Sequence, residues 1–194
     1  MGELRGLIIL DRDGVLNRML GVPHTPTYDS PMNTSQVELC EGAAEVLRDL
    51  TQAGYGLAIA TNQPAAAKGK TTRAELEDVH RLVVDGVSAL GGKILSSHIC
   101  WHRAEDGCLC RKPKPGLLEE AIRINAQFAR SGHVWMVGDR PVDVMAGAAL
   151  GLSTAFLSND SVDEMFSSHS VRPTFHGADL RDFRRLLFRQ SYSE

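Results

Sequence analysis

Short apolar runs alternate with longer mixed segments along the chain. Five of the runs have the length of buried strands: residues 7–10, 56–60, 93–99, 133–137 and 153–157. The other segments are predicted to be helices: residues 41–53, 72–90, 117–130, 142–150 and 178–189. Because strands separated by helical crossovers form a parallel sheet covered on both faces, we predict an α/β fold with a Rossmann-like, doubly wound parallel sheet.

Two helix boundaries are marked by residues with known terminal preferences. Thr72 and Glu75 fit the capping-box pattern, and apolar residues then recur at spacings of three and four positions. Gly54 follows the segment 41–53, where glycine commonly ends a helix because it adopts left-handed backbone angles without strain. The segment from Thr72 is the clearest helix in the sequence.

The stretch from about residue 17 to residue 39 has no hydrophobic periodicity. It contains Pro23, Pro26 and Pro31, and prolines at this density exclude a regular helix. We predict that this stretch forms a flap over the ends of the strands. No internal repeat, low-complexity tract or linker divides the chain, so residues 1–194 are expected to form one domain.

Composition narrows the range of partners. The chain has 194 residues, 43% of them hydrophobic, and a formal net charge of −3, which gives no electrostatic reason to expect nucleic acid or a membrane surface as a partner. No apolar run approaches the length of a membrane span, and the N-terminus lacks a signal-peptide pattern. We therefore expect a cytoplasmic protein with a small-molecule ligand, either a monomer or a small homo-oligomer.

Two carboxylates follow the first predicted strand. Asp11 and Asp13 are two positions apart, so in extended chain they project to the same side while Arg12 turns away. Two carboxylates placed in this way repel each other unless a cation lies between them. Mg²⁺ fits this role, because it binds one or two carboxylates and keeps positions for water and a substrate phosphate.

Polar residues also end two other predicted strands. Thr61 and Asn62 follow the run 56–60, and Asp139 follows the run 133–137. The carboxyl ends of parallel strands meet at one edge of the sheet, which is where open α/β sheets bind ligands. This convergence favours an active site over an acidic turn with no function.

A cluster of three cysteines and one histidine indicates a second metal site. Cys100, His102, Cys108 and Cys110 offer three thiolates and one imidazole, which together form a closed tetrahedral set for a structural Zn²⁺. The four cysteines of the chain are an alternative source of two disulfides, but a reducing compartment favours the metal. Cys40 lies apart from this cluster and is expected to be a small hydrophobic residue in the core.

The order of these motifs resembles that of the haloacid dehalogenase superfamily. The resemblance spans about residues 7–156 and rests on four motifs: Asp11-x-Asp13-Gly14, Thr61 after a strand, Lys112 before a helix, and Gly138-Asp139-x-x-x-Asp143. Local strings such as Asp-Arg-Asp-Gly and Cys-Arg-Lys-Pro are similar to those of small phosphatases that act on heptose 1,7-bisphosphate and on histidinol phosphate. The resemblance implies a capless fold with a zinc loop at residues 100–110.

The resemblance also implies roles for the acidic residues. Asp11 is expected to be the nucleophile that forms an aspartyl-phosphate, and Asp13 to protonate the leaving group and then deprotonate water. Mg²⁺ is expected to be held by Asp11, by Asp13 through its carbonyl, and by Asp139. Asp143 is expected to support this site from the next helical turn.

Other residues are implied to bind the phosphate and the rest of the substrate. Thr61 offers its hydroxyl and backbone amides to phosphate oxygens, and Lys112 supplies a positive charge near the nucleophile. Asn62, Gln63 and Arg111 are expected to flank the phosphate and the sugar side of the substrate.

The chain departs from the phosphatase pattern at two places. Pro64 follows the Thr-Asn-Gln string where these enzymes usually have a small polar residue, and proline removes a backbone donor near the phosphate. The flap also looks longer than its counterpart in heptose phosphatases. Neither of the two places where a cap domain would be inserted carries enough residues to form one. We therefore expect an open site.

The preferred reading is a Mg²⁺-dependent phosphatase of a sugar phosphate, with D-glycero-D-manno-heptose 1,7-bisphosphate as the best candidate. The string 112–117 resembles that of heptose bisphosphatases, and Arg111 and Lys114 offer cations that would bind a second phosphate but repel an amine. Three alternatives remain open at this point: a phosphatase of histidinol phosphate or another small phosphomonoester, a phosphotransferase, and a zinc-stabilised binding module without activity.

Overall fold

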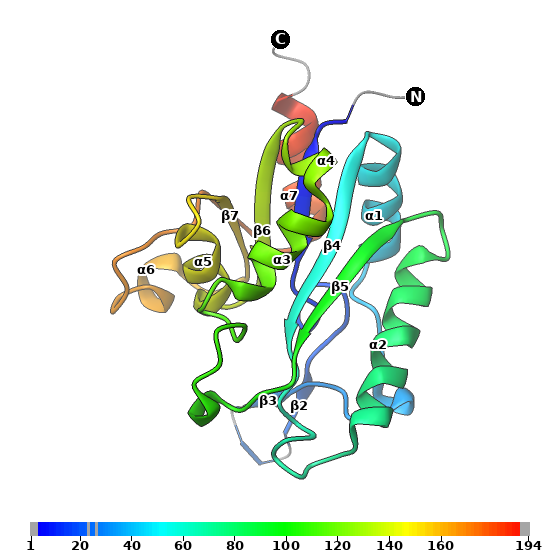
Figure 1. The fold of residues 1–194 in the computed structure, drawn as a ribbon, viewed down its shortest axis with the longest axis vertical. Helices are drawn as coiled ribbons and strands as arrows, with labels where there is room; N and C mark the ends of the chain where they lie inside the picture. Colours follow the sequence, from blue (N-terminus) through cyan, green and yellow to red (C-terminus); the bar gives the residue numbers. More distant parts are fainter. Residues whose placement is uncertain (1–3, 23, 26, 191–194) are drawn as a thin grey trace.

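The structure is a computed structural model that describes residues 4–22, 24–25 and 27–190. Its main sheet has six parallel strands in the order β5-β4-β1-β6-β7-β8 (Figure 1). The strands are β1 (Gly6–Leu10), β4 (Tyr55–Asn62), β5 (Ile94–Cys100), β6 (His133–Gly138), β7 (Ser153–Leu157) and β8 (Phe175–Gly177). The predicted doubly wound parallel sheet is confirmed.

Strand β1 lies between β4 and β6 in the sheet and contributes side chains to both layers of the core. All five of its residues are buried, which explains why it reads as a continuous apolar run rather than as an alternating pattern. Ile8 and Leu10 belong to the core layer on one face of the sheet, and Leu7 and Ile9 belong to the layer on the other face. The period of two along the strand therefore divides its side chains between the two layers.

Helices cover both faces of the sheet. The first layer is formed by α1 (Ala43–Gln52), α2 (Arg73–Ser88) and α7 (Leu180–Gln190). The second layer is formed by α3 (Gly116–Ile124), α4 (Ala126–Ala129) and α5 (Pro141–Ala148). Among the described residues, no helix combines the length and apolar composition that a membrane span requires.

The two predicted helix boundaries are confirmed. The Thr72 hydroxyl accepts a hydrogen bond from the Glu75 amide at 3.2 Å, and the Glu75 carboxylate accepts one from the Thr72 amide at 3.1 Å. Gly54, just after α1, has a φ angle of +94°, which a residue with a side chain would adopt only with strain. Local sequence signals therefore define where α1 ends and α2 begins.

Three features differ from the prediction. The predicted helix 117–130 is interrupted at Asn125, whose side-chain amide donates to the Ala121 carbonyl at 2.8 Å and to the Ser96 hydroxyl at 2.7 Å. Strand β8 and the short helix α6 (Val162–Met165) were not predicted. Both are only three or four residues long, too short to produce a hydrophobic pattern.

The predicted flap contains a small hairpin without an α-helix in its described part. Strands β2 (Leu20–Gly21) and β3 (Tyr28–Asp29) pair antiparallel, and a 3₁₀ turn follows at Thr34–Gln36. Figure 1 shows the hairpin beyond the end at which β4 and β5 finish. Pro23 and Pro26, on which part of the flap prediction rested, lie outside the described residues. Cys40 is partly buried against the core, in agreement with its predicted hydrophobic role.

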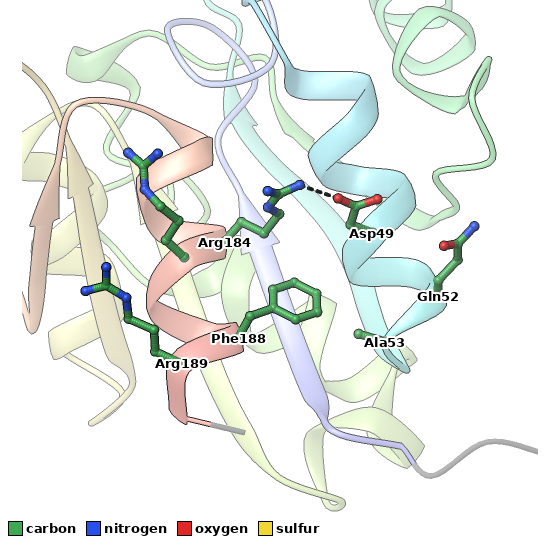
Figure 2. Close-up of a pocket in the computed structure, with 7 residues that line it drawn as sticks. Asp49, Gln52, Ala53, Arg184, Phe188 and Arg189 are labelled. Carbon is green, nitrogen blue, oxygen red and sulfur yellow. Dashed lines mark hydrogen bonds and ion pairs between the residues drawn. The ribbon is translucent and has the colours of Figure 1, made fainter. Parts of the chain in front are cut away.

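A groove between α1 and α7 marks the opposite edge of the sheet. Figure 2 shows Arg184 of α7 paired with Asp49 of α1, with Phe188 beside the groove. The groove encloses about 600 Å³ and reaches Ala53, which directly precedes β4. It therefore lies at the edge where the strands begin, away from the residues that follow their carboxyl ends.

Candidate active site

Three carboxylates meet at the carboxyl edge of the sheet. Asp11 directly follows β1, Asp139 directly follows β6, and Asp143 lies in the first turn of α5. One carboxylate oxygen from each of them lies within 4.8 Å of the others. The structure thus makes Asp143 a full member of the cluster, whereas the sequence suggested only a supporting position.

Two glycines make room for this cluster. Gly14 has a φ angle of +84°, and a Cβ atom at this position would lie 2.1 Å from an Asp139 oxygen. A Cβ atom on Gly138 would lie 2.3 Å from an oxygen of Asp143. Any larger residue at either position would displace a carboxylate from the cluster.

Lys112 is the cation that contacts the cluster. Its Nζ lies 3.0 Å from Asp11 Oδ1 and 2.6 Å from Asp143 Oδ1, and it donates to the Ala60 carbonyl at 2.7 Å. The Asn62 side chain fixes the backbone of this lysine, accepting from its amide and donating to its carbonyl, both at 3.1 Å. The Asn62 amide, predicted to contact substrate, is therefore engaged in holding Lys112.

Negative charge exceeds positive charge among the described side chains that contact the cluster. Burial, assisted by neighbouring carboxylates, raises the pKa of Asp11 to about 6 and that of Asp139 to about 8. Asp11 and Asp143 raise the pKa of Lys112 above its usual range in spite of burial. In the described part of the chain, the buried Oδ1 of Asp139 has no hydrogen-bond donor. One lysine facing three carboxylates leaves negative charge that a divalent cation with oxygen ligands would neutralise.

Asp13 lines the same small cavity as Asp11, but other side chains hold its carboxylate. The cavity measures about 40 Å³. Arg12 does not turn away as expected, because its guanidinium folds back and bonds both oxygens of Asp13. Burial alone would raise the pKa of Asp13, but the Arg12 charge and hydrogen bonds from Gln63, Ser30 and Asn17 hold it below the usual range.

Thr61 and Gln63 extend from the end of β4 toward this carboxylate. The Gln63 amide donates to Asp13 Oδ2 at 2.6 Å and to the Thr61 hydroxyl at 2.9 Å. Because Thr61 accepts this bond through its oxygen, its own proton remains available for a phosphate oxygen. Gln63 was predicted to flank the substrate. In the structure its side-chain nitrogen donates to Asp13, while the residue also lines the neighbouring cavity.

A second cavity of about 200 Å³ adjoins the first and is lined by Lys68, Arg111 and Arg140 among other residues. The sequence prediction named only Arg111 of these three. Lys114, which it also named, donates to the Gly107 carbonyl at 2.8 Å and does not line this cavity.

The two cations that were not predicted, Lys68 and Arg140, lie beside predicted motifs. Arg140 directly follows Asp139. Lys68 is presented by the turn after the Thr-Asn-Gln string, which is closed by a 3.0 Å hydrogen bond from its own amide to the Pro64 carbonyl. Pro64 therefore helps to define the turn that carries the lysine.

The four predicted zinc ligands lie together. Their separations are 3.7 Å from Cys100 Sγ to both Cys108 Sγ and His102 Nδ1, 3.5 Å between the Cys108 and Cys110 sulfurs, and 3.3 Å from Cys110 Sγ to His102 Nδ1. Ligands at tetrahedral zinc distances lie about 3.4–3.8 Å from one another. The donor set and these four separations fit tetrahedral Zn²⁺, and all four ligand atoms lie within 4.8 Å of one another.

The cysteine and histidine loop is connected to the active-site edge. Arg111, which follows Cys110, donates to the His102 carbonyl at 3.3 Å. On the other side, the Arg73 guanidinium lies 4.7 Å from the centre of the Trp101 ring. The loop thus bridges the start of α2 and the segment that delivers Lys112.

Comparison with known families identifies the class of protein. A family model for haloacid dehalogenase-like hydrolases matches residues 30–151. The chain therefore belongs to the haloacid dehalogenase-like hydrolases.

Individual relatives refine this assignment. A D-glycero-beta-D-manno-heptose-1,7-bisphosphate 7-phosphatase of Neisseria meningitidis is 36% identical over 189 residues, covering 95% of this chain and 96% of the relative. The histidine biosynthesis bifunctional protein HisB of Legionella pneumophila is 30% identical over 165 residues, covering 85% of this chain and 45% of that protein. These relationships place the chain among the phosphoric monoester hydrolases of the family.

A solved structure shares the fold over nearly its whole length. The D,D-heptose 1,7-bisphosphate phosphatase from B. bronchiseptica, complexed with magnesium and phosphate, superimposes with a TM-score of 0.79 at 27% identity. The match covers 95% of this chain and 99% of the other chain.

Proposed function

We propose that the protein is a Mg²⁺-dependent phosphatase that hydrolyses a sugar phosphate through an aspartyl-phosphate on Asp11. D-glycero-D-manno-heptose 1,7-bisphosphate is the best candidate substrate. The observation that carries the proposal is the contact between Asp11 and the buried Lys112, beside a cavity lined by further cations. The similarity over whole chains to heptose bisphosphate phosphatases supports the same substrate.

In the first step, Asp11 attacks the phosphorus atom. Lys112 and the Arg12 amide both contact Asp11 Oδ1, at 3.0 and 2.7 Å, so Oδ2 is the candidate nucleophile. A bond forms between this oxygen and phosphorus while the bond from phosphorus to the sugar oxygen breaks. Because its pKa is lowered, Asp13 must first take up a proton from solvent, and it gives this proton to the departing alkoxide. Thr61 donates a hydrogen bond from its hydroxyl to a phosphate oxygen.

In the second step, Asp13 takes a proton from a water molecule. The water oxygen bonds to phosphorus, the bond from phosphorus to Asp11 breaks, and inorganic phosphate and the free carboxylate are regenerated. We propose that Asp11, Asp139 and the Asp13 carbonyl hold Mg²⁺, with Asp143 beside them. When bound, Mg²⁺ would neutralise charge on the transferring phosphoryl group.

The cavity beside the nucleophile favours a substrate with a second phosphate. Lys68 and Arg140 both line this cavity, and the Arg140 charge also acts on Asp139. With Arg111, they would attract a second phosphate and repel the ammonium group of histidinol phosphate. The chain is also 36% identical to the heptose phosphatase over 95% of its length, against 30% identity to the HisB protein over 85% of its length.

Steady-state kinetics on the two substrates test this proposal. We expect kcat/KM for heptose 1,7-bisphosphate to exceed that for histidinol phosphate by at least roughly tenfold, or about 1.4 kcal/mol of transition-state discrimination. Lys68→Met should reduce this preference, and Lys114→Met is the matched control because Lys114 lies outside the cavity. Equal or reversed preference in the unaltered protein would reject the heptose assignment and leave the phosphatase assignment standing.

The pKa shifts predict how Mg²⁺ binding depends on pH. In the metal-free protein, the pKa values of Asp11 and Asp139 are about 6 and 8, above the ordinary value of 3.8. Between pH 6 and 8 the fold therefore holds protons that Mg²⁺ must displace, and affinity should rise with pH by up to about tenfold per unit for each proton displaced.

Thermal denaturation measures this effect directly. The increase in Tm produced by a fixed Mg²⁺ concentration should be larger at pH 8 than at pH 6, and mild chelation should remove both the increase and the activity reversibly. Distant titrating groups change Tm equally with and without metal at a given pH, so their contribution cancels from the Mg²⁺-dependent increase. An increase that is the same at both pH values would contradict the assignment of Asp11 and Asp139 as ligands.

We also propose that residues 1–194 form one domain. The two core layers of the described chain share β1, whose alternate residues enter one layer or the other. Unfolding in a single cooperative transition would support this proposal.

A further inference from the structure

Arg12 is a fully buried arginine whose guanidinium contacts Asp13. It is 0% exposed. Its Nε and Nη2 donate to Asp13 Oδ1 at 3.0 and 2.8 Å, and Nη2 also donates to Oδ2 at 3.0 Å. The guanidinium therefore contacts both oxygens and fixes the plane of the carboxylate.

Two more buried side chains donate to the same carboxylate. Gln63 donates to Asp13 Oδ2 at 2.6 Å, and Asn17 donates to Oδ1 at 3.0 Å. The backbone of Asn17 is held by the turn after β1. Its backbone N–H donates to the Arg12 carbonyl at 3.1 Å, and its backbone carbonyl accepts from the Gly14 N–H at 2.7 Å. Donors from three residues, distributed over both oxygens, oppose the rotation that the terminal torsion of an aspartate otherwise permits.

The orientation of Arg12 is determined by Asp13 rather than by its own solvation. Its third nitrogen, Nη1, is buried and has no acceptor among the described residues. Leaving a buried guanidinium donor unpaired is unfavourable, so the contacts of the other two nitrogens with Asp13 must offset this cost. These two nitrogens, Nε and Nη2, both donate to the carboxylate of Asp13.

We propose that Arg12 is a positioning residue for Asp13, which it holds, together with Gln63 and Asn17, in line with the leaving-group oxygen beside Asp11. This inference rests on the proposed phosphatase function. Proton transfer between oxygen atoms requires hydrogen-bond distance and alignment, so a carboxylate that is free to rotate would protonate the leaving group less often. Lysine cannot replace arginine here, because a single ammonium lacks the planar pair of donors.

The inference predicts a dependence on the leaving group. A sugar alkoxide must be protonated as it departs, whereas p-nitrophenolate is stable enough to leave without a proton. Since kcat/KM reports only the steps up to formation of the aspartyl-phosphate, it isolates this difference from the later hydrolysis. A residue that only stabilises the fold would change kcat/KM for both substrates in the same proportion.

The test compares Arg12→Lys with the unaltered protein on heptose 1,7-bisphosphate and on p-nitrophenyl phosphate, both with Mg²⁺. We expect kcat/KM to fall at least roughly 30-fold for the sugar phosphate and no more than about threefold for the aryl phosphate, given the usual contribution of general acid catalysis. Arg184→Lys is the matched control, because Arg184 pairs with Asp49 at the far edge of the sheet (Figure 2) and should change neither value.

The outcomes distinguish this inference from the proposed function. If the unaltered protein hydrolyses neither compound, the proposed function fails. If it hydrolyses both and Arg12→Lys lowers both equally, or lowers neither, the positioning role is overturned. If Arg12→Lys does not fold, Gln63→Met decides in the same way, because it removes one donor to Asp13 and introduces no charge.

Discussion

Asp11→Asn should abolish turnover, with a loss of at least roughly four orders of magnitude in kcat, as is usual for removal of a nucleophile. An amide oxygen at this position is too weak a nucleophile to form the covalent intermediate. The fold should persist, because the substitution removes a charge that is unfavourably buried and leaves Lys112 paired with Asp143. Steady-state kinetics, circular dichroism and zinc content on the same preparation measure these expectations.

Asp49→Asn is the matched control for this substitution. Asp49 lies in the groove between α1 and α7 and pairs with Arg184, so its loss should leave turnover unchanged. Substantial residual hydrolysis by Asp11→Asn, at a level above contamination by unaltered enzyme, would contradict an aspartyl-phosphate mechanism.

The second large effect concerns the proposed zinc site. Protein purified without chelator should contain about one zinc per chain, and Cys108→Ser should lose it. We expect a loss of about 3 kcal/mol in the free energy of unfolding, since loss of a metal is among the largest effects of a single substitution. For a chain of this size, that corresponds to a fall of roughly 6–12 °C in Tm.

Cys40→Ser provides the control for the zinc prediction. Cys40 lies outside the cluster of Cys100, His102, Cys108 and Cys110, so this variant should keep its zinc. Below its melting temperature, Cys108→Ser should retain much of its activity, because the proposed zinc ligands do not include Asp11 or Asp13. Absence of zinc from the unaltered protein would refute the assignment of this loop.

The sequence was sufficient to predict the layers of the fold because the central strand is buried on both faces. In β1, Ile8 and Ile9 enter opposite core layers, so the strand reads as an unbroken apolar run. Helix α2 was equally clear, because Thr72 and Glu75 cap it through contacts within a single turn. Both signals are local and do not depend on distant parts of the chain.

Other features depend on partners that are distant in sequence. Strand β8 has three residues, and its pairing partner is β7. Asn125 interrupts the predicted helix because its side chain bonds the Ala121 carbonyl and the Ser96 hydroxyl of β5, in competition with the regular helical pattern. Neither contact can be read from the pattern of apolar residues around it.

The site was predictable in its carboxylates but not in its longer side chains. Alternation along extended chain predicted that Asp11 and Asp13 would lie together, and both line one small cavity. Alternation does not fix where a long side chain ends, and the guanidinium of Arg12 folds back onto Asp13. For the same reason, Lys68 reaches the cavity that Lys114 was expected to line.

The most direct test of the central claim is to trap the phosphorylated enzyme. Rapid acid quenching during turnover of heptose 1,7-bisphosphate, followed by mass spectrometry of the digested protein, should find one phosphoryl group on the peptide containing Asp11, and hydroxylamine should remove it, as expected for an acyl phosphate. We expect this label in the unaltered protein and not in Asp11→Asn. Active enzyme in which the Asp11 peptide never carries phosphate, or in which the label lies on another residue, would contradict it.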